Sequence, residues 1–215
     1  MKFFDRVLEL LYPTKCTFCH KLTGGDTVCK SCAEKLPLTA GAAQAQKFPF
    51  ISQCVSPLYY EGDVRESLLR YKFGGLSHYS AVYAGFMAKC IDENQISCDI
   101  ITWVPLSRKR LRKRGYDQAK LLAGELSERT GIPCCRLLKK TRNNPAQSGT
   151  GGAEKRRANV SGVYTALKPE KIKGKSILLV DDIVTTGATL SECGRILLSA
   201  GAGEVRAVTV ARKRN

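Results

Sequence analysis

Apolar and polar residues follow two periods along this chain, one typical of strands and one typical of helices. Short apolar runs bounded by turn residues predict strands over 54–60, 98–104, 134–138, 160–167, 177–180 and 204–211. Longer stretches with apolar residues on one helical face predict helices over 62–73, 79–91, 116–130 and 189–200. Because strands alternate with helices, we expect an α/β fold, with a mainly parallel sheet flanked by helices.

Three segments depart from this pattern. Residues 3–11 predict a short amphipathic helix, and 39–50 lack a strong apolar period, so we interpret them as a linker. Residues 139–159 also lack a period, which predicts a long loop, and long loops inside compact domains are usually functional. The predicted organisation is a helix with a cysteine module over 1–38, the linker, and a main domain over 51–215.

Four of the ten cysteines form two Cys-x-x-Cys pairs near the start of the chain: Cys16, Cys19, Cys29 and Cys32. Four thiolates at this spacing can close a tetrahedral Zn²⁺ site, and the metal would supply the folding energy of a module too small for its own core. A redox pair is the alternative, but two pairs in one short segment favour structural zinc. We expect the other six cysteines to be buried free thiols.

A run near the end of the chain predicts an anion site. An apolar strand over 177–180 leads into Asp181 and Asp182, where open α/β sheets place ligands. A short loop and the start of a helix follow, and their backbone N–H groups favour a phosphate. The hydroxyl and small side chains of this loop are Thr185, Thr186, Gly187, Ala188 and Thr189. The two acids are suited to ribose hydroxyls or a divalent cation.

The net charge of +16 is concentrated in two segments that we expect to be loops. Residues 106–114 hold six basic side chains and no acid, and residues 139–157 hold six against one acid, which together give +11. Such charge favours a polyanionic partner: nucleic acid, nucleotide phosphates or an anionic membrane. With no secretory signal and no apolar stretch near the roughly 20 residues of a membrane helix, we expect a cytoplasmic protein without an integral membrane segment.

These features together resemble a known family. The run Ile177 to Thr189 is similar to the phosphoribosyl-diphosphate (PRPP) binding motif of the type I phosphoribosyltransferases. Five further features of the chain resemble the ComF (competence protein F) family. They are Val104-Pro105 with the basic run after it, Arg114-Gly115-Tyr116-Asp117-Gln118-Ala119, Gln147, Arg156-Arg157-Ala158-Asn159-Val160 and the paired cysteines. The resemblance spans nearly the whole chain. It implies a type I phosphoribosyltransferase fold with a small amino-terminal zinc-binding module of the double zinc ribbon type.

The resemblance also implies how PRPP binds. Loop 185–189 would hold the 5′-phosphate, with Gly187 allowing close backbone approach. Asp181 and Asp182 would hold the ribose hydroxyls, directly or through Mg²⁺, and Arg108 is our first choice for the pyrophosphate. Purine-salvage members of the wider fold carry an acid at the position of Thr185. The threonine of this chain therefore leaves the phosphoribosyl acceptor, and any turnover, unidentified.

The basic surplus exceeds what one pyrophosphate requires and predicts single-stranded DNA binding. ComF relatives are associated with competence and transformation, which implies a DNA-uptake protein and a competence helicase or other uptake protein as a partner. The role of Tyr116 has two interpretations: its ring stacks on a base, or it is buried at the start of a helix. The predicted DNA-binding residues are Arg108, Lys109, Arg110, Arg112, Lys113, Arg114, Arg156 and Arg157.

Two other functions stay open. One is an active phosphoribosyltransferase that transfers the phosphoribosyl group of PRPP to an unidentified base or amine, with the loop 139–159 closing over the pocket. The other is a regulatory module that senses PRPP and binds partners through its zinc-binding pairs.

Overall fold

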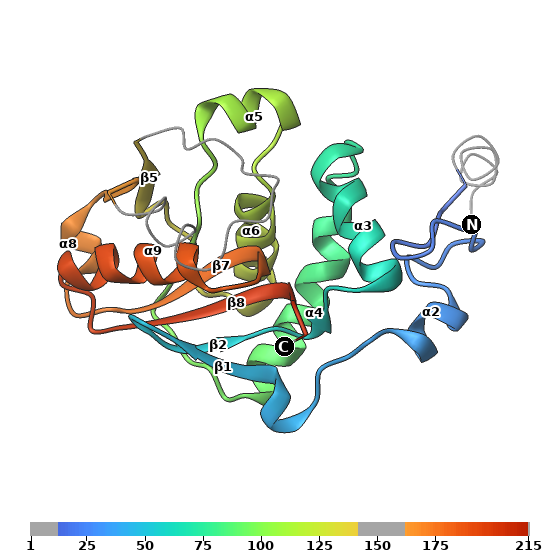
Figure 1. Cartoon of the computed structure of the whole chain (residues 1–215), viewed down its shortest axis with the longest axis horizontal. Coiled ribbons are helices and arrows are strands. Elements are labelled where there is room, and N and C mark those ends of the chain that lie inside the picture. Colours follow the sequence, from blue (N-terminus) through green and yellow to red (C-terminus); the bar gives the residue numbers. More distant parts are fainter. Residues whose placement is uncertain (1–12, 142–161, 215) are drawn as a thin grey trace.

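The computed structural model describes residues 13–141 and 162–214, and one mixed sheet lies at its centre (Figure 1). The strands of this sheet are β1 (Ala45–Phe48), β2 (Ile51–Val55), β3 (Leu58–Tyr59), β4 (Ile100–Trp103), β7 (Ser176–Val184) and β8 (Glu204–Arg212). A separate ribbon pairs β5 (Leu138–Lys140) with β6 (Tyr164–Ala166). The helices are α2 (Lys30–Lys35), the 3₁₀ turn η1 (Gly41–Gln44), α3 (Gly62–Phe73), α4 (Tyr79–Glu93), α5 (Arg108–Arg114), α6 (Gln118–Thr130), α8 (Pro169–Ile172) and α9 (Ala188–Ser199).

The sheet is mainly parallel, as predicted. Its strand order is β1-β2-β8-β7-β4, and short β3 pairs with the far end of β8. Every pairing in it is parallel except that of β1 with β2. The two longest strands, β7 and β8, lie side by side in the middle, because their long apolar runs can be covered on both faces.

Alternate residues of β7 face two different apolar layers. Leu178 and Val180 pack in a cluster with side chains of α3, α4 and α6. Ile177 and Leu179 pack in a second cluster with side chains of α9 and of the β5–β6 ribbon. The sheet is therefore covered on both faces, so polar side chains of its strands reach solvent at the strand ends.

The sequence predicted the long helices well and the strand limits less well. The four predicted helices are confirmed as α3, α4, α6 and α9; α3 has the predicted bounds, and the other three differ by one or two residues at their ends. The predicted core strand over 177–180 continues to Val184, because β8 stays paired beside it that far. The strand predicted over 134–138 is misplaced. Cys134 makes a single bridge to Ile101, and the strand begins only at Leu138, where β6 offers a partner.

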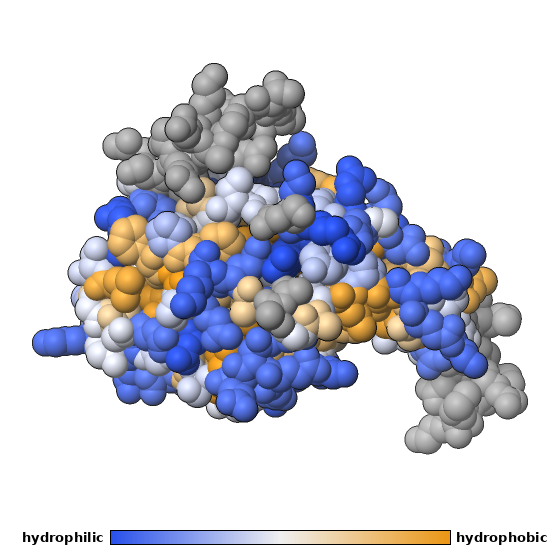
Figure 2. Space-filling view, turned by 60° about the horizontal axis from the view of Figure 1, so that its bottom comes forward, coloured by the Kyte–Doolittle hydropathy of each residue, from blue (hydrophilic) through white to orange (hydrophobic). Residues whose placement is uncertain are grey.

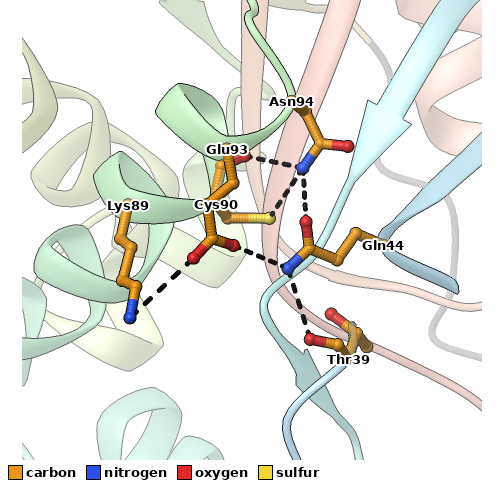
Figure 3. A network of polar contacts seen from close by, with 6 residues as sticks. All are labelled: Thr39, Gln44, Lys89, Cys90, Glu93 and Asn94. Atoms are coloured by element: carbon orange, nitrogen blue, oxygen red, sulfur yellow. Dashed lines mark hydrogen bonds and ion pairs between the residues drawn. The ribbon is translucent and has the colours of Figure 1, made fainter. Parts of the chain in front are cut away.

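Part of the expected linker is instead the edge strand β1, anchored by side chains just before it (Figure 3). The Gln44 amide donates to the Glu93 carboxylate (2.8 Å) and to the Thr39 carbonyl (3.3 Å). The amide oxygen of Gln44 accepts from Asn94, at the end of α4. These bonds fix the segment by long-range contacts, which no local apolar period reveals.

The cysteine segment packs against the main domain. Phe18 is fully buried, with its ring 6.1 Å from that of Tyr83 on α4. From α3, the Ser67 hydroxyl donates to the Thr17 carbonyl, and the Arg70 guanidinium donates to the Phe18 carbonyl. The segment therefore shares a core with α3 and α4.

Within 13–141 and 162–214, no helix has the length and apolar character that crossing a membrane requires. Hydrophilic side chains interrupt the hydrophobic ones over the face drawn in Figure 2. The predicted helix over 3–11 and nearly all of the predicted loop over 139–159 lie outside the described residues.

Candidate functional site

A pocket opens beside β7 because its neighbour β4 ends early. The two strands pair only as far as Trp103 and Val180, after which the Val104 N–H donates to the Val180 carbonyl (3.0 Å). Pro105 follows and the chain leaves the sheet, whereas β8 continues beside β7 to Val184. The free flank of β7 faces a pocket of about 150 Å³.

Asp181 and Asp182 lie at this flank, and both line the pocket. As neighbours in a strand they point to opposite faces. The Asp182 carboxylate lies 3.0 Å from the Lys72 ammonium of α3, and these side chains are only 13% and 16% exposed. Lys72 therefore balances the charge of Asp182 inside the pocket.

Asp181 is in a less favourable environment. Burial and the neighbouring Asp182 charge raise the pKa of Asp181 to about 8, against the opposing effects of the Asp182 N–H and of Lys72. The Asp182 N–H donates to Asp181 Oδ1 (2.8 Å). The two acids are thus unequal: one has a cation beside it, and the other is desolvated.

A smaller hollow of about 40 Å³ lies next to the acids, lined by Asp181 and residues 183–190. It is formed where β7 ends and α9 begins. The first N–H groups of a helix have no partner within the helix, and they favour an anion. Asp181 and Thr189 line both the hollow and the pocket, so the two spaces are contiguous. The five loop residues expected from the sequence, 185–189, all line this hollow.

Gly187 gives the loop its shape. Its φ is +71°, a conformation that side chains with a Cβ rarely adopt. A Cβ at this position would lie 2.1 Å from Cδ1 of Phe48, so the ring of β1 packs directly behind the loop. The edge strand therefore supports the anion hollow.

Four basic side chains line the pocket: Lys72 of α3, Arg110 and Arg114 of α5, and Lys140 of β5. Lys140 Nζ lies 3.1 Å from the Tyr164 hydroxyl and 5.0 Å from the centre of its ring. Burial and the nearby Arg110 charge lower the pKa of Lys140. The pocket thus places acids at one side and several cations around the rest.

The first basic segment forms helix α5, so the prediction of a loop there is wrong. The Ser107 hydroxyl accepts the Arg110 N–H (3.4 Å) at its start, and Gly115 ends it with φ +81°. Helical spacing puts Arg110 and Arg114 on one face, toward the pocket. The exposed cations are Arg108, Lys109, Arg112 and Lys113.

This arrangement changes the first choice for a pyrophosphate contact. Arg108 is exposed and does not line the pocket, whereas Arg110 and Arg114 do. Arg156 and Arg157 lie outside the described residues. The Tyr116 hydroxyl donates to the Tyr71 carbonyl, which gives this ring the packing role.

Sequence reasoning missed three pocket residues: Lys72, Lys140 and Tyr164. Lys72 carries no local signal, because it is one basic residue at the end of an ordinary helix. Lys140 belongs to the second basic segment and was counted only as charge. Tyr164 reaches the pocket through the β5–β6 pairing, which no local pattern predicts.

A second site is the cluster of Cys16, Cys19, Cys29 and Cys32, whose sulfur atoms all lie within 4.8 Å of one another. The Cys19 and Cys29 sulfurs are 3.7 Å apart. When four sulfur atoms surround Zn²⁺ in a tetrahedron with Zn–S bonds of about 2.3 Å, two of the sulfur atoms are about 3.8 Å apart. The Cys29 and Cys32 N–H groups each donate to a cluster sulfur at 3.4 Å. The donor set and its geometry fit structural Zn²⁺.

The remaining six cysteines are free thiols, as predicted, but only three of them are buried as expected. Cys54, Cys90 and Cys193 are buried, and burial raises the pKa of Cys54 to about 12. The half-buried ones are Cys98, Cys134 and Cys135.

Two family models match the chain: a phosphoribosyl transferase domain over 113–215 and a double zinc ribbon domain over 7–44. Competence protein ComFC of Bacillus subtilis (strain 168) is 28% identical over 92% of this chain and 77% of its own length. Competence protein ComFC of Streptococcus pneumoniae (strain ATCC BAA-255 / R6) is 27% identical over 97% and 85%. The DNA utilization protein YhgH of Escherichia coli (strain K12) is 27% identical over 89% and 87%.

Over most of its length the chain is therefore similar to ComF competence proteins. It combines the type I phosphoribosyltransferase fold with an amino-terminal zinc module, which confirms the fold predicted from the sequence. It is thus a competence-related, phosphoribosyltransferase-like protein.

Removal of zinc should destabilise the main domain of this chain. Because the cysteine segment shares its core with α3 and α4, Cys16→Ser should lower the unfolding temperature by roughly 5–10 °C, at about 2–4 °C per kcal/mol. Fluorescence of Trp103, the single tryptophan, reports this transition from β4. Cys98→Ser is the matched control outside the cluster. An unchanged Trp103 transition would show that the segment folds independently.

Asp181→Asn should stabilise the protein, and more so at higher pH. The unfolded carboxyl ionises near pH 4, whereas the folded carboxyl stays protonated up to about pH 8, so wild-type stability falls as pH rises across that window. We expect a gain of several kcal/mol at pH 8 and little at pH 4, at about 1.4 kcal/mol for each unit of pKa difference, measured by urea unfolding. Asp182→Asn should instead lower stability, because it leaves Lys72 buried without its partner. A gain from Asp181→Asn that does not change with pH would contradict this account.

Gly187→Ala should lower the free energy of unfolding by about 2–3 kcal/mol, through overpacking against Phe48 and the strained positive φ. Adding Phe48→Ala should recover part of the Gly187→Ala loss relative to Phe48→Ala alone. Gly124→Ala in α6 is the control, because nothing lies within 4 Å of the added Cβ there. Equal effects of the two glycine substitutions in chemical unfolding would rule out the proposed contact.

Proposed function

We propose that this protein binds single-stranded DNA along α5 and holds PRPP in the pocket at the end of β7. One observation carries the proposal. An anion hollow, an acid pair and a helix with six cations and no acid meet at one edge of the sheet. The names of the relatives, which refer to competence and DNA utilization, agree with a role on DNA.

The chemistry of the pocket suits each part of PRPP. The N–H groups at the start of α9 are donors for the 5′-phosphate. Asp181 and Asp182 offer oxygen atoms to the ribose hydroxyls and to Mg²⁺, which binds carboxylates together with phosphates. Arg110 and Arg114 supply charge for the pyrophosphate, in place of Arg108.

The outer face of α5 suits a polynucleotide backbone. Arg108, Lys109, Arg112 and Lys113 are exposed, and the helix itself contains no acid. Each phosphate of a single strand that such a cation neutralises contributes about −0.7 to the slope of log affinity against log salt. DNA binding should therefore weaken steeply as salt rises.

A second function, transfer of the phosphoribosyl group to a base or amine, is favoured by the cations around the pocket. Arg110, Arg114 and Lys140 would stabilise the negative charge of a departing pyrophosphate. The acids would meet the positive charge that develops on the ribose ring. Thr185 is not a proton acceptor of the purine-salvage kind, so the acceptor stays unidentified.

Two sets of substitutions separate the proposed activities. Arg108→Ala, Arg112→Ala and Lys113→Ala together should weaken single-stranded DNA binding and reduce its salt slope by about 2. The same variant should keep its affinity for PRPP with Mg²⁺, because these side chains are exposed away from the pocket. Asp181→Ala with Asp182→Ala should abolish PRPP binding in calorimetry and retain DNA binding.

Pyrophosphate release from PRPP, followed with a panel of bases and amines, tests for turnover. Binding of PRPP and DNA without release would reject the transferase function. The main proposal fails if the wild type shows no salt-sensitive DNA binding, or if the double aspartate variant binds PRPP as well as the wild type does.

A further inference from the structure

Phe73 is an exposed aromatic residue at the end of α3. Its side chain is 61% exposed, and it follows directly after Lys72 in the last turn of the helix. Consecutive residues of a helix point about 100° apart. Lys72 therefore enters the pocket and pairs with Asp182, while the neighbouring ring stays in solvent.

Arg114 connects this ring to the basic helix and to the pocket. Its guanidinium lies over the Phe73 ring, 5.0 Å from the ring centre. The same side chain lines the pocket and donates to Gln118 Oε1 (2.9 Å), which holds it in place. The ring is thus supported from one face and still open to solvent.

The surroundings distinguish Phe73 from an ordinary exposed apolar residue. Single exposed hydrophobic side chains are common and need no explanation. Phe50, which is 50% exposed, is such a case, at the turn between β1 and β2. Phe73 instead lies against α5, whose six cations surround the exposed Leu111. An aromatic ring within a strip of cations is the arrangement that binds single strands, because bases stack on the ring while phosphates meet the cations.

We propose that Phe73 and Arg114 form a stacking platform for one base of a single-stranded DNA, at the mouth of the phosphoribosyl pocket. This inference rests on the proposed DNA binding and assigns it a base contact. The outer cations of α5 hold the backbone, and the open face of Phe73 takes the base. The platform reads no sequence, because every base has a face that can stack.

The test compares Phe73→Ala with Phe50→Ala in the full-length, zinc-loaded protein. On an oligothymidylate, Phe73→Ala should lose about tenfold in affinity, and Phe50→Ala should bind like the wild type. The salt slope of Phe73→Ala should match that of the wild type, because no phosphate contact is removed. An abasic oligonucleotide of equal length should bind the wild type and Phe73→Ala equally.

Phe73→Trp supplies a direct signal. Trp103, the single native tryptophan, is 8% exposed, so a tryptophan at position 73 would dominate any change on binding. The variant should bind oligothymidylate like the wild type, and its emission should be quenched.

Unchanged emission at saturation would overturn the platform. So would a loss of affinity by Phe73→Ala that is as large on the abasic strand as on oligothymidylate. Unaltered oligothymidylate affinity of Phe73→Ala, with a wild type that binds, would overturn it while leaving the proposed function intact. Absence of wild-type binding would overturn both.

Discussion

The position of helix α3 is the constraint on which both sites of this protein depend. Ser67 and Arg70, in its middle, donate to carbonyls of the cysteine segment. In the next two residues, the Tyr71 hydroxyl donates to the Gln118 carbonyl, and Lys72 reaches Asp182 in the pocket. A helix of this length, 12 residues, is a stiff element because consecutive turns are joined by backbone hydrogen bonds. One helix therefore holds both the cysteine segment and the ammonium that balances the acid pair, although the four cysteines do not line the pocket.

The pocket owes its existence to two parallel strands of unequal length. Because β4 leaves the sheet at Pro105, polar side chains of β7 find space where a neighbouring strand would have excluded them. The arrangement costs free energy, since Asp181 is desolvated beside another acid. A fold selected for stability alone would place an apolar or neutral residue there. A desolvated acid at a strand end is the kind of local departure from stability that is expected at a functional site.

The sequence predicted what local chemistry determines and missed what long-range contacts determine. The acids, the glycine-containing turn and the four cysteines were found because each motif is contiguous or regularly spaced. Strand β1 was missed because Gln44 anchors it from a distance to α4. Helix α5 was missed because a run of cations has no apolar period, although Ser107 is a typical residue before a helix and Gly115 is a typical residue after one. Arg108 was preferred to Arg110 for the same reason: without the helix, the sequence does not say which basic residues share a face.

Strand β8 lies between β2 and β7 in the sheet, although it follows both of them in the sequence. During synthesis the cysteine segment, α3 and α4 leave the ribosome early and can pack together. Strand β2 and one edge of β7 have to wait for residues 204–212. At elongation rates of about 5–20 residues per second, these two unpaired edges stay open for seconds, and open edges invite pairing with other chains. In a chain of this topology, the partner that protects both edges, β8, is therefore made after both of them.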